Sequence, residues 1–350
     1  MQPDVLSCCI DFFILHYHRM KKIFSNKILV LISTIILVVF VDRIFTKNIP
    51  PKKISSVSLA ENFWIAPDSS KIPDNEEGAM IRYGKSLISN TAFYLGPKGK
   101  ISHSTNGMNC QNCHLNAGTK PWGNNFAGVY STYPKFRERR GAVETVVQRV
   151  NDCLERSLNG NPLDSNSREM QCILAYMKWL GKDVPKGQKP KGCAIQQPSY
   201  LSRAADAQKG KLVYEAKCML CHHANGEGQP NMDSISYLYP PLWGMHSYNT
   251  GAGLYRLSRF AGYVKDNMPF GATHQNTQLT DEEAWDVAAY VNSQPRPKGD
   301  FKNDWPNISL KPIDHPFGPY TDSFSEQQHK YGPFTAIQKA KENSAKKKSS

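Results

Sequence analysis

The stretch Cys-Gln-Asn-Cys-His at 110–114 recurs as Cys-Met-Leu-Cys-His at 218–222. In a C-x-x-C-H pentad the two thiols form thioethers to the vinyl groups of a haem, and the histidine that follows ligates the iron from the proximal side. The sequence therefore predicts two covalently bound haem c groups. The attachment residues are Cys110, Cys113 and His114 for the first haem and Cys218, Cys221 and His222 for the second.

A C-x-x-C pair also occurs as half of a zinc site or as a redox dithiol. A zinc site needs a second pair of ligands at a short return spacing. Here each pentad stands alone, far from the other in the chain. The isolated pentads therefore favour haem over zinc, and haem attachment of this kind takes place outside the cytoplasm.

The N-terminal region has the pattern of an export signal. A basic stretch from Met20 to Lys27 precedes an apolar run from Ile28 to Val41, in the order of an n-region and an h-region. The cleavage-like sequence at 58–60 lies well beyond the apolar run. We therefore expect residues 20–45 to be a signal anchor, residues 1–19 to be a non-structural extension, and the haem domains to lie in the periplasm, attached to the cytoplasmic membrane.

The net charge of +13 is concentrated at the two ends of the chain. Residues 1–53 hold eight Lys and Arg against three Asp, and residues 335–350 hold five Lys against one Glu. The termini thus account for most of the net positive charge, and the rest of the chain has an ordinary balance of surface charges. No nucleic-acid partner is expected.

Between the termini the chain repeats one pattern of amphipathic helices. Each unit opens with a helix that carries Gly-Lys and closes with a helix that carries Ala-Tyr. A small residue on one helix and an aromatic residue on the other suit a close crossing of the first and last helices. The predicted helices are Glu76–Ser89 and Arg168–Leu180 in the first unit and Ala204–Lys217 and Asp281–Val291 in the second.

We therefore expect an all-α fold of two tandem domains similar to cytochrome c. The first spans residues 46–185 and the second residues 201–297, joined by a linker over 186–200 in a region rich in Lys, Pro and Gly. Residues 298–350 lack sustained periodicity. This predicts an irregular extension that ends in a disordered basic tail.

The sixth ligand of each iron separates an electron carrier from an enzyme. In the second unit Met268, in an Asn-Met-Pro loop before the closing helix, is the expected ligand, and His/Met ligation raises the haem potential. Met245 is the competing methionine. The first unit has no comparable Met-Pro loop and offers Cys153 instead. From the residues alone, a disulfide of Cys153 with Cys172 or Cys193 stays open.

Further stretches carry a family pattern. They are Cys-His-Leu-Asn-Ala-Gly at 113–118, the segment 133–149, Asn-Asp-Cys-Leu-Glu-Arg-Ser-Leu-Asn-Gly at 151–160, Pro-Pro-Leu-Trp-Gly at 240–244 and Gly-Ala-Gly at 251–253. Together with the pentads, these stretches resemble the dihaem thiosulfate dehydrogenase and tetrathionate reductase family over roughly residues 75–300.

The resemblance implies roles for particular residues. In that family the cysteine of the Cys-x-Glu-Arg-Ser run is the distal ligand of the first haem at the substrate site, which here implies Cys153. Two arginines that hold the anionic ends of the substrate match Arg139 and Arg149 by spacing, with Ser157 beside them. A haem-propionate partner is the alternative role for each arginine. Asn267 stands where some members carry Lys, a departure that resembles members working well as tetrathionate reductases.

The resemblance thus implies a periplasmic oxidoreductase that joins two thiosulfate ions into tetrathionate with release of two electrons, and catalyses the reverse. Cys153 would be the sulfur nucleophile. The electron partner would be a periplasmic or membrane-bound carrier such as another cytochrome c. Three alternatives are a dihaem electron carrier without catalysis of its own, a dihaem peroxidase, and a sulfur-carrier-type cytochrome of the thiosulfate-oxidising complex.

Overall fold

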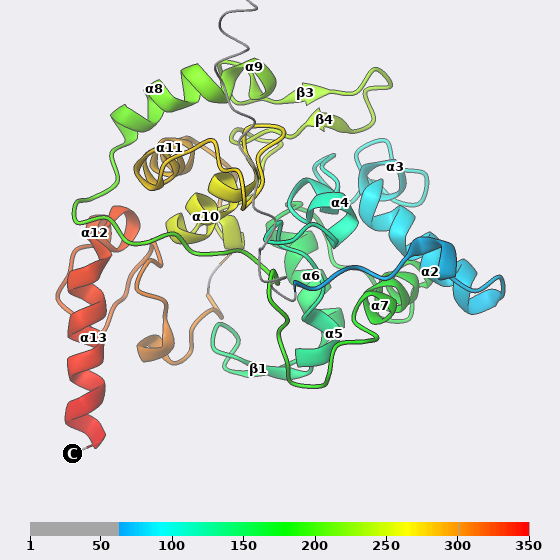
Figure 1. Cartoon of the computed structure of the whole chain (residues 1–350), viewed down its shortest axis with the longest axis horizontal. Helices are drawn as coiled ribbons and strands as arrows, with labels where there is room; N and C mark the ends of the chain where they lie inside the picture. Colours follow the sequence, from blue (N-terminus) through cyan, green and yellow to red (C-terminus); the bar gives the residue numbers. More distant parts are fainter. Residues whose placement is uncertain (1–62, 301, 350) are drawn as a thin grey trace, which may run out of the picture. The chain divides into compact units, whose positions relative to one another are not determined.

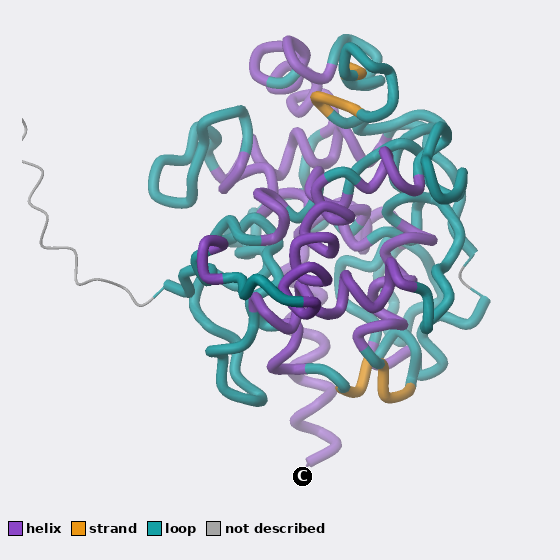
Figure 2. The backbone as a smooth tube through the Cα atoms, turned by 90° about the vertical axis from the view of Figure 1, so that its right-hand side faces the viewer, coloured by secondary structure: helices purple, strands orange, loops and turns teal. Residues whose placement is uncertain are grey.

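The computed structural model describes residues 63–300 and 302–349. Helices dominate this part of the chain (Figures 1 and 2). The longer helices are α2 (Glu76–Ser89), α6 (Val146–Arg156), α7 (Arg168–Leu180), α8 (Ala207–Lys217), α10 (Leu257–Asn267), α11 (Asp281–Ser293) and α13 (Phe334–Ser349). The shorter helices are α3 (Thr91–Leu95), α4 (Leu115–Gly118), α5 (Val129–Thr132), α9 (Met219–His222) and α12 (Glu326–Tyr331). Single 3₁₀ turns cover Ser69–Lys71, Cys110–Asn112, Gly253–Tyr255 and Ile308–Leu310.

Strands contribute little to the described residues. Antiparallel strands β1 (Lys135–Arg137) and β2 (Ala142–Glu144) pair with Phe136 opposite Val143. A second antiparallel pair joins β3 (Gln229–Pro230) to β4 (Tyr237–Tyr239). The helix-dominated fold agrees with the expected all-α class, and the first hairpin matters because it carries Arg139 in its turn.

The first and last helices of each unit cross closely, as the sequence predicts. Helix α2 packs against α7, and α8 packs against α11 (Figure 1). A Cβ atom added to Gly84 would lie 1.9 Å from the carbonyl oxygen of Cys172, and one added to Gly210 would lie 1.8 Å from that of Asp286. Only glycine lets the backbones approach this closely. Tyr176 is fully buried at the first crossing.

We expect Gly210→Ala to lower the free energy of unfolding by about 2 to 3 kcal/mol, because the new methyl group must displace a helix backbone. Denaturant titration of the holoprotein measures this loss. Gly253→Ala is the matched control, since a Cβ there meets nothing within 4 Å, and its effect should stay within about 0.5 kcal/mol. Equal stability of Gly210→Ala and wild type would contradict the close crossing.

The N-termini of the closing helices are capped by side chains. At α11, the amide of Glu283 donates to Thr280 Oγ1 at 3.1 Å, and the amide of Thr280 donates to Glu283 Oε2 at 2.9 Å. These two hydrogen bonds form a capping box, which satisfies two otherwise unpaired amides. At α7 the amide of Met170 donates to Ser167 Oγ at 3.2 Å.

The two units share part of their hydrophobic core. The first core lies mainly between α2 and α7, and the second is built on α8, α10 and α11 around Trp285. Three buried side chains of the first unit, Met108, Leu154 and Leu158, belong to the second core. Leu154 directly follows Cys153 in α6, so packing between the units fixes the helix that carries this cysteine.

The C-terminal extension is not irregular throughout. Helix α13 continues to Ser349, so the expected disordered tail is wrong for these residues. Phe334 and Ile337 at its start are buried in the second core. This apolar anchorage explains why the polar sequence beyond them continues as a helix.

Upstream of this helix, Asp314 is buried and accepts hydrogen bonds from Arg256 and from the Ser258 amide and hydroxyl.

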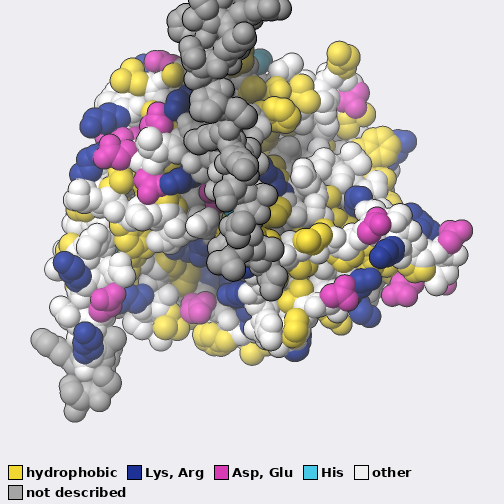
Figure 3. All heavy atoms as spheres, in the orientation of Figure 1, with side chains coloured by type: hydrophobic (Ala, Val, Ile, Leu, Met, Phe, Trp, Pro, Cys, Tyr) yellow, Lys and Arg dark blue, Asp and Glu magenta, His cyan; other side chains and the backbone are white. Residues whose placement is uncertain are grey.

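Charges of both signs alternate on the visible face of the protein (Figure 3). Within the described ranges, no helix is both long and apolar enough to cross a membrane. The predicted anchor at 20–45 and the extension at 1–19 lie outside the described residues.

Candidate active site

Each pentad folds into one tight turn that presents its histidine in the same way. The amide of His114 donates to the carbonyl of Cys110 at 2.9 Å, and that of His222 to the carbonyl of Cys218 at 3.0 Å. His114 Nδ1 lies 2.5 Å from the carbonyl oxygen of Asn124, and His222 Nδ1 lies 2.9 Å from that of Pro240. Because a carbonyl only accepts, both Nδ1 atoms carry the proton. The Nε2 lone pair is thereby left for a metal.

The protein environment keeps the pentad histidines in the neutral state that iron ligation requires. Desolvation lowers the pKa of His114 to about 4 and lowers that of His222, so both imidazoles are neutral near pH 7. Neutral imidazole is the form that ligates iron. Desolvation also raises the pKa of Cys110 to about 11 and that of Cys113 to about 12. The residues present therefore fit a covalent haem at each pentad.

The zinc alternative finds no support in the geometry. Among residues 63–300 and 302–349, no three His, Cys, Asp or Glu side chains gather as a metal site would require. The described cysteines, those of the pentads included, are all free of disulfides. A pair of histidines with oriented Nε2 atoms, each beside two thiols, matches haem attachment instead.

Cys153 lies within electrostatic range of the first pentad. Helix α6 begins at a capping box formed by Thr145 and Gln148 and runs for two further turns to Cys153. The nearby Cys153 sulfur contributes to the raised pKa values of both Cys110 and Cys113, after desolvation. It is also the main reason why the pKa of Arg149 lies above its ordinary value. Cys153 therefore lies close to all three side chains.

A structural disulfide does not account for Cys153. Cys172 and Cys193, its two possible partners, are free, as is Cys153 itself. Cys172 is buried at the crossing of α2 and α7, and Cys193 lies beside Gly128. The alternative left open by the sequence is thus removed, and Cys153 remains as a half-buried thiol next to the haem attachment residues.

The arginines around Cys153 divide into two groups. Between residues 137 and 156 the chain has five arginines. Three are paired with carboxylates: Arg137 with Glu144, Arg140 with Glu144 and Asp152, and Arg156 with Asp304. Arg139 and Arg149 form no ion pair or side-chain hydrogen bond with any described residue. The two arginines that the sequence selects are therefore the two without a direct carboxylate partner among the described residues.

The electrostatics of these two arginines differ. Arg149 lies one helical turn before Cys153 on the same face of α6, with i, i+4 spacing. Desolvation, followed by the charges of Arg156 and Arg149, lowers the pKa of Arg139 to about 10, so this guanidinium remains charged near neutral pH. Ser157 follows α6, and its amide donates to the carbonyl of Cys153 at 2.8 Å. Hence all four residues predicted for the substrate site belong to one region.

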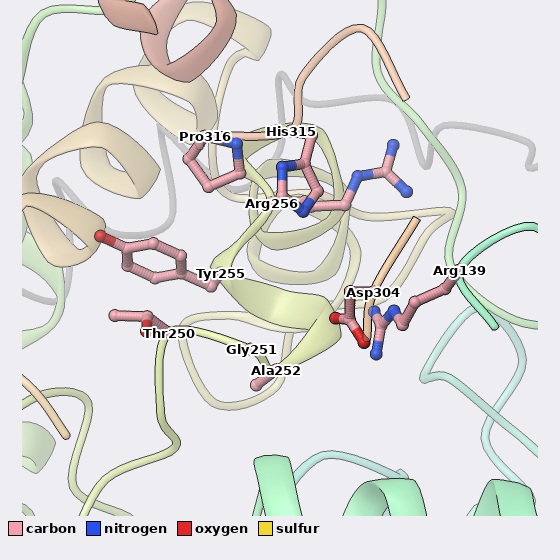
Figure 4. Close-up of a pocket in the computed structure, with 9 residues that line it drawn as sticks. All are labelled: Arg139, Thr250, Gly251, Ala252, Tyr255, Arg256, Asp304, His315 and Pro316. Atoms are coloured by element: carbon pink, nitrogen blue, oxygen red, sulfur yellow. The ribbon is translucent and has the colours of Figure 1, made fainter. Parts of the chain in front are cut away.

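The C-terminal extension also reaches this region, which the sequence did not predict. Both oxygens of Asp304 accept from Arg156, at 2.8 and 2.9 Å. The amide of Trp305 donates to the carbonyl of Arg139 at 2.7 Å. Figure 4 shows Asp304 and Arg139 side by side in a small pocket that His315 also lines. The extension thus neutralises Arg156 and holds the backbone of Arg139.

The candidate ligand of the second haem is better placed than its competitor. Met268 ends α10 and is half-buried against the second core, whereas Met245 is 74% exposed. The neighbouring Asn267 is buried and donates from Nδ2 to the carbonyl oxygens of Trp122 and Tyr263. Asn267 therefore joins the two units together.

Comparison with known proteins agrees with this geometry. Residues 100–185 match the model of the SoxA/TsdA cytochrome c domain, and residues 207–295 match that of cytochrome c. The chain is 40% identical over 243 residues to the thiosulfate dehydrogenase of Psychrobacter arcticus, covering 69% of this chain and 71% of that protein. It is 39% identical over 235 residues to the thiosulfate dehydrogenase of Allochromatium vinosum, covering 66% and 83%. The chain belongs to the thiosulfate dehydrogenase family.

A solved member of the thiosulfate dehydrogenase family has a similar fold. The thiosulfate dehydrogenase TsdBA of Marichromatium purpuratum, in its as-isolated form, aligns with a TM-score of 0.62 and 30% identity. The alignment covers 67% of this chain and 50% of that one, so this chain spans half of the longer protein. The chain is a cytochrome c-type oxidoreductase with two cytochrome c domains and two covalently bound haem c groups.

Proposed function

We propose that the protein interconverts thiosulfate and tetrathionate, with Cys153 as the sulfur nucleophile. The observation that carries this proposal is the placement of Cys153 near two arginines, Arg139 and Arg149, that form no direct ion pair with a described carboxylate. Both substrates are dianions, and a desolvated guanidinium binds sulfonate oxygens through charge-assisted hydrogen bonds. An electron carrier without catalysis has no use for such a site.

The reaction balances with Cys153 as the only covalent group of the chain. The Cys153 thiolate and the sulfane sulfur of one thiosulfate form an S–S bond, giving Cys153-S-S-SO₃⁻ and releasing two electrons. A second thiosulfate attacks the outer sulfur of this adduct, and the Cys153 thiolate leaves as tetrathionate forms. When bound, the two haems supply acceptors for one electron each. The reverse sequence reduces tetrathionate.

The arginines bind and orient the substrate in this scheme. Arg149 holds the sulfonate of the thiosulfate that reacts with Cys153, because it lies one turn away on the same helix. Arg139, in the turn of the first hairpin, holds the more distant sulfonate, and Ser157 offers a hydroxyl beside them. Planar guanidinium groups suit this task better than lysine would.

We also propose the axial ligands. His114 and Cys153 would hold the first iron, and His222 and Met268 the second. The oriented Nε2 atoms of the two histidines, the free Cys153 thiol and the half-buried Met268 support this assignment.

The decisive experiment uses the purified holoprotein with both haems attached. Thiosulfate should reduce the haems, and tetrathionate should oxidise the reduced protein, each followed optically. If no electron transfer occurs in either direction, the protein is better explained as a dihaem electron carrier without catalysis of its own. Hydrogen peroxide serves as a third substrate, and turnover with peroxide alone would favour the peroxidase.

We expect Met268→Gly to change the optical spectrum of the second haem and to slow electron exit, while a thiosulfate unit can still attach to Cys153. The thioether is the proposed sixth ligand, and its loss alters the ligand field. Mass spectrometry of the protein reports the attached unit. Met245→Gly is the matched control. A spectrum that changes with Met245→Gly and not with Met268→Gly would overturn the assignment.

Location and partner follow from the same proposal. Haem c attachment places both domains in the periplasm, and we propose that residues 20–45 anchor them to the cytoplasmic membrane. The electron partner would be another cytochrome c, soluble or membrane-bound. The buried Asn267, in place of a potential Lys ligand, supports a protein that works well as a tetrathionate reductase.

A further inference from the structure

Arg296 lies just beyond the last helix of the second cytochrome domain and is enclosed by aromatic rings. Its guanidinium carbon stands 4.3 Å from the centre of the Tyr248 ring and 5.2 Å from that of Tyr255. Tyr248 and Tyr255 are both buried. Stacking on aromatic faces is a common environment of arginine and orients the plane of its nitrogens.

The hydrogen bonds of Arg296 are incomplete among the described residues. Nη2 donates to the carbonyl of Val291 at 2.6 Å. The Nε and Nη1 atoms are buried and reach no acceptor. No carboxylate in the described part of the chain pairs with this guanidinium. Buried guanidinium nitrogens with missing acceptors are costly, and an anion at this position would supply both the acceptors and the opposite charge.

The surroundings of Arg296 associate it with the second haem. Tyr248 lies in the loop between Pro240 and α10. The carbonyl of Pro240 accepts from His222, and Met268 directly follows α10. A loop that joins the proximal carbonyl to the distal ligand must pass around the edge of the haem. The Tyr248 hydroxyl donates to Asn292 of α11 at 2.9 Å, so Arg296 and both its neighbouring segments are parts of the second unit. Cys113 of the first pentad is also near Tyr248, so a larger change of potential at the first haem would overturn the assignment to the second.

A haem c group brings two carboxylates of its own, the propionates, on the edge opposite its thioethers. We propose that Arg296 binds a propionate of the second haem and thereby raises the reduction potential of that haem. A fixed positive charge near a haem stabilises the reduced form, which carries one more negative charge. The inference rests on the ligation proposed above, in which His222 and Met268 hold the second iron.

The test is spectroelectrochemical titration of the holoprotein, in which the two haems are followed separately by their different spectra. Arg296→Gln should lower the equilibrium constant for reduction of the second haem about tenfold. For a one-electron couple this corresponds to a reduction potential that is lower by about 59 mV. The first haem should change much less. Arg296→Lys, which keeps the charge, should recover most of the potential. Lys298→Gln removes an exposed charge two residues further on and should leave both potentials unchanged.

A second variant keeps the inference testable if Arg296→Gln does not fold. Tyr248→Leu removes the ring that orients the guanidinium and should lower the potential of the second haem, whereas Tyr248→Phe keeps the ring and should not. A higher KM for thiosulfate with unchanged potentials would assign Arg296 to the substrate and overturn the inference. A loss of stability with unchanged potentials would also overturn it. Failure of the proposed ligation is distinguishable, because it shows in the spectrum of Met268→Gly.

Discussion

Cys153→Ala should retain two covalent haems and lose thiosulfate oxidation and tetrathionate reduction together, each by on the order of 10³-fold or more. The proposed covalent adduct cannot form without the sulfur, and one site must catalyse both directions through the same transition state. Alanine keeps the helix propensity of α6. The fold should persist because Leu154, and not Cys153, anchors this helix in the shared core.

The measurements are haem content, the spectrum of the first haem, and turnover in both directions. The first-haem spectrum should change, because the proposed sixth ligand is gone. Cys193→Ser is the matched control, since this cysteine is free, half-buried and separate from the proposed ligands. A Cys153→Ala protein that still turns over thiosulfate would reduce Cys153 to a structural role.

Arg149→Gln should raise the KM for thiosulfate about thirtyfold with little change in kcat. Losing one charge-assisted hydrogen bond to a bound anion costs about 2 kcal/mol. An interaction that is equal in the ground state and the transition state acts on KM alone. Arg139→Gln should act in the same direction, and more strongly on tetrathionate, because this guanidinium is proposed to hold the more distant sulfonate.

Steady-state kinetics and haem titrations together test this prediction. Arg140→Gln is the control from the same segment, because its charge is already compensated by Glu144 and Asp152. It should leave KM nearly unchanged. An unaltered KM in Arg149→Gln, combined with a lower potential of the first haem, would make Arg149 a propionate partner instead.

The local features of this protein could be read from its sequence. Haem attachment depends on five consecutive residues, so each pentad contains its own chemistry. The close helix crossings follow from Gly84 and Gly210, since a glycine at a regular helix position has few other uses. The capping box of α11 is likewise a signal confined to four residues.

The sequence predicts the residues of the substrate site only in part. Cys153, Arg139 and Arg149 were selected through family resemblance, because a lone cysteine or arginine carries no local signal of its role. Which arginines keep a free charge depends on carboxylates elsewhere in the fold. Asp304 lies 148 residues from Arg156 in the chain, and no periodicity or motif connects the two.

By itself, then, the sequence determined the two haems, the helical class and the paired helices, because each depends on spacing within a few turns of chain. The tertiary structure decided which charges are compensated, how the C-terminal extension enters the site, and that two nitrogens of Arg296 are buried without acceptors among the described residues. These properties depend on which residues become neighbours when the chain folds. Burial and charge pairing between distant segments have no counterpart in the order of residues, and they appear only when the chain has packed.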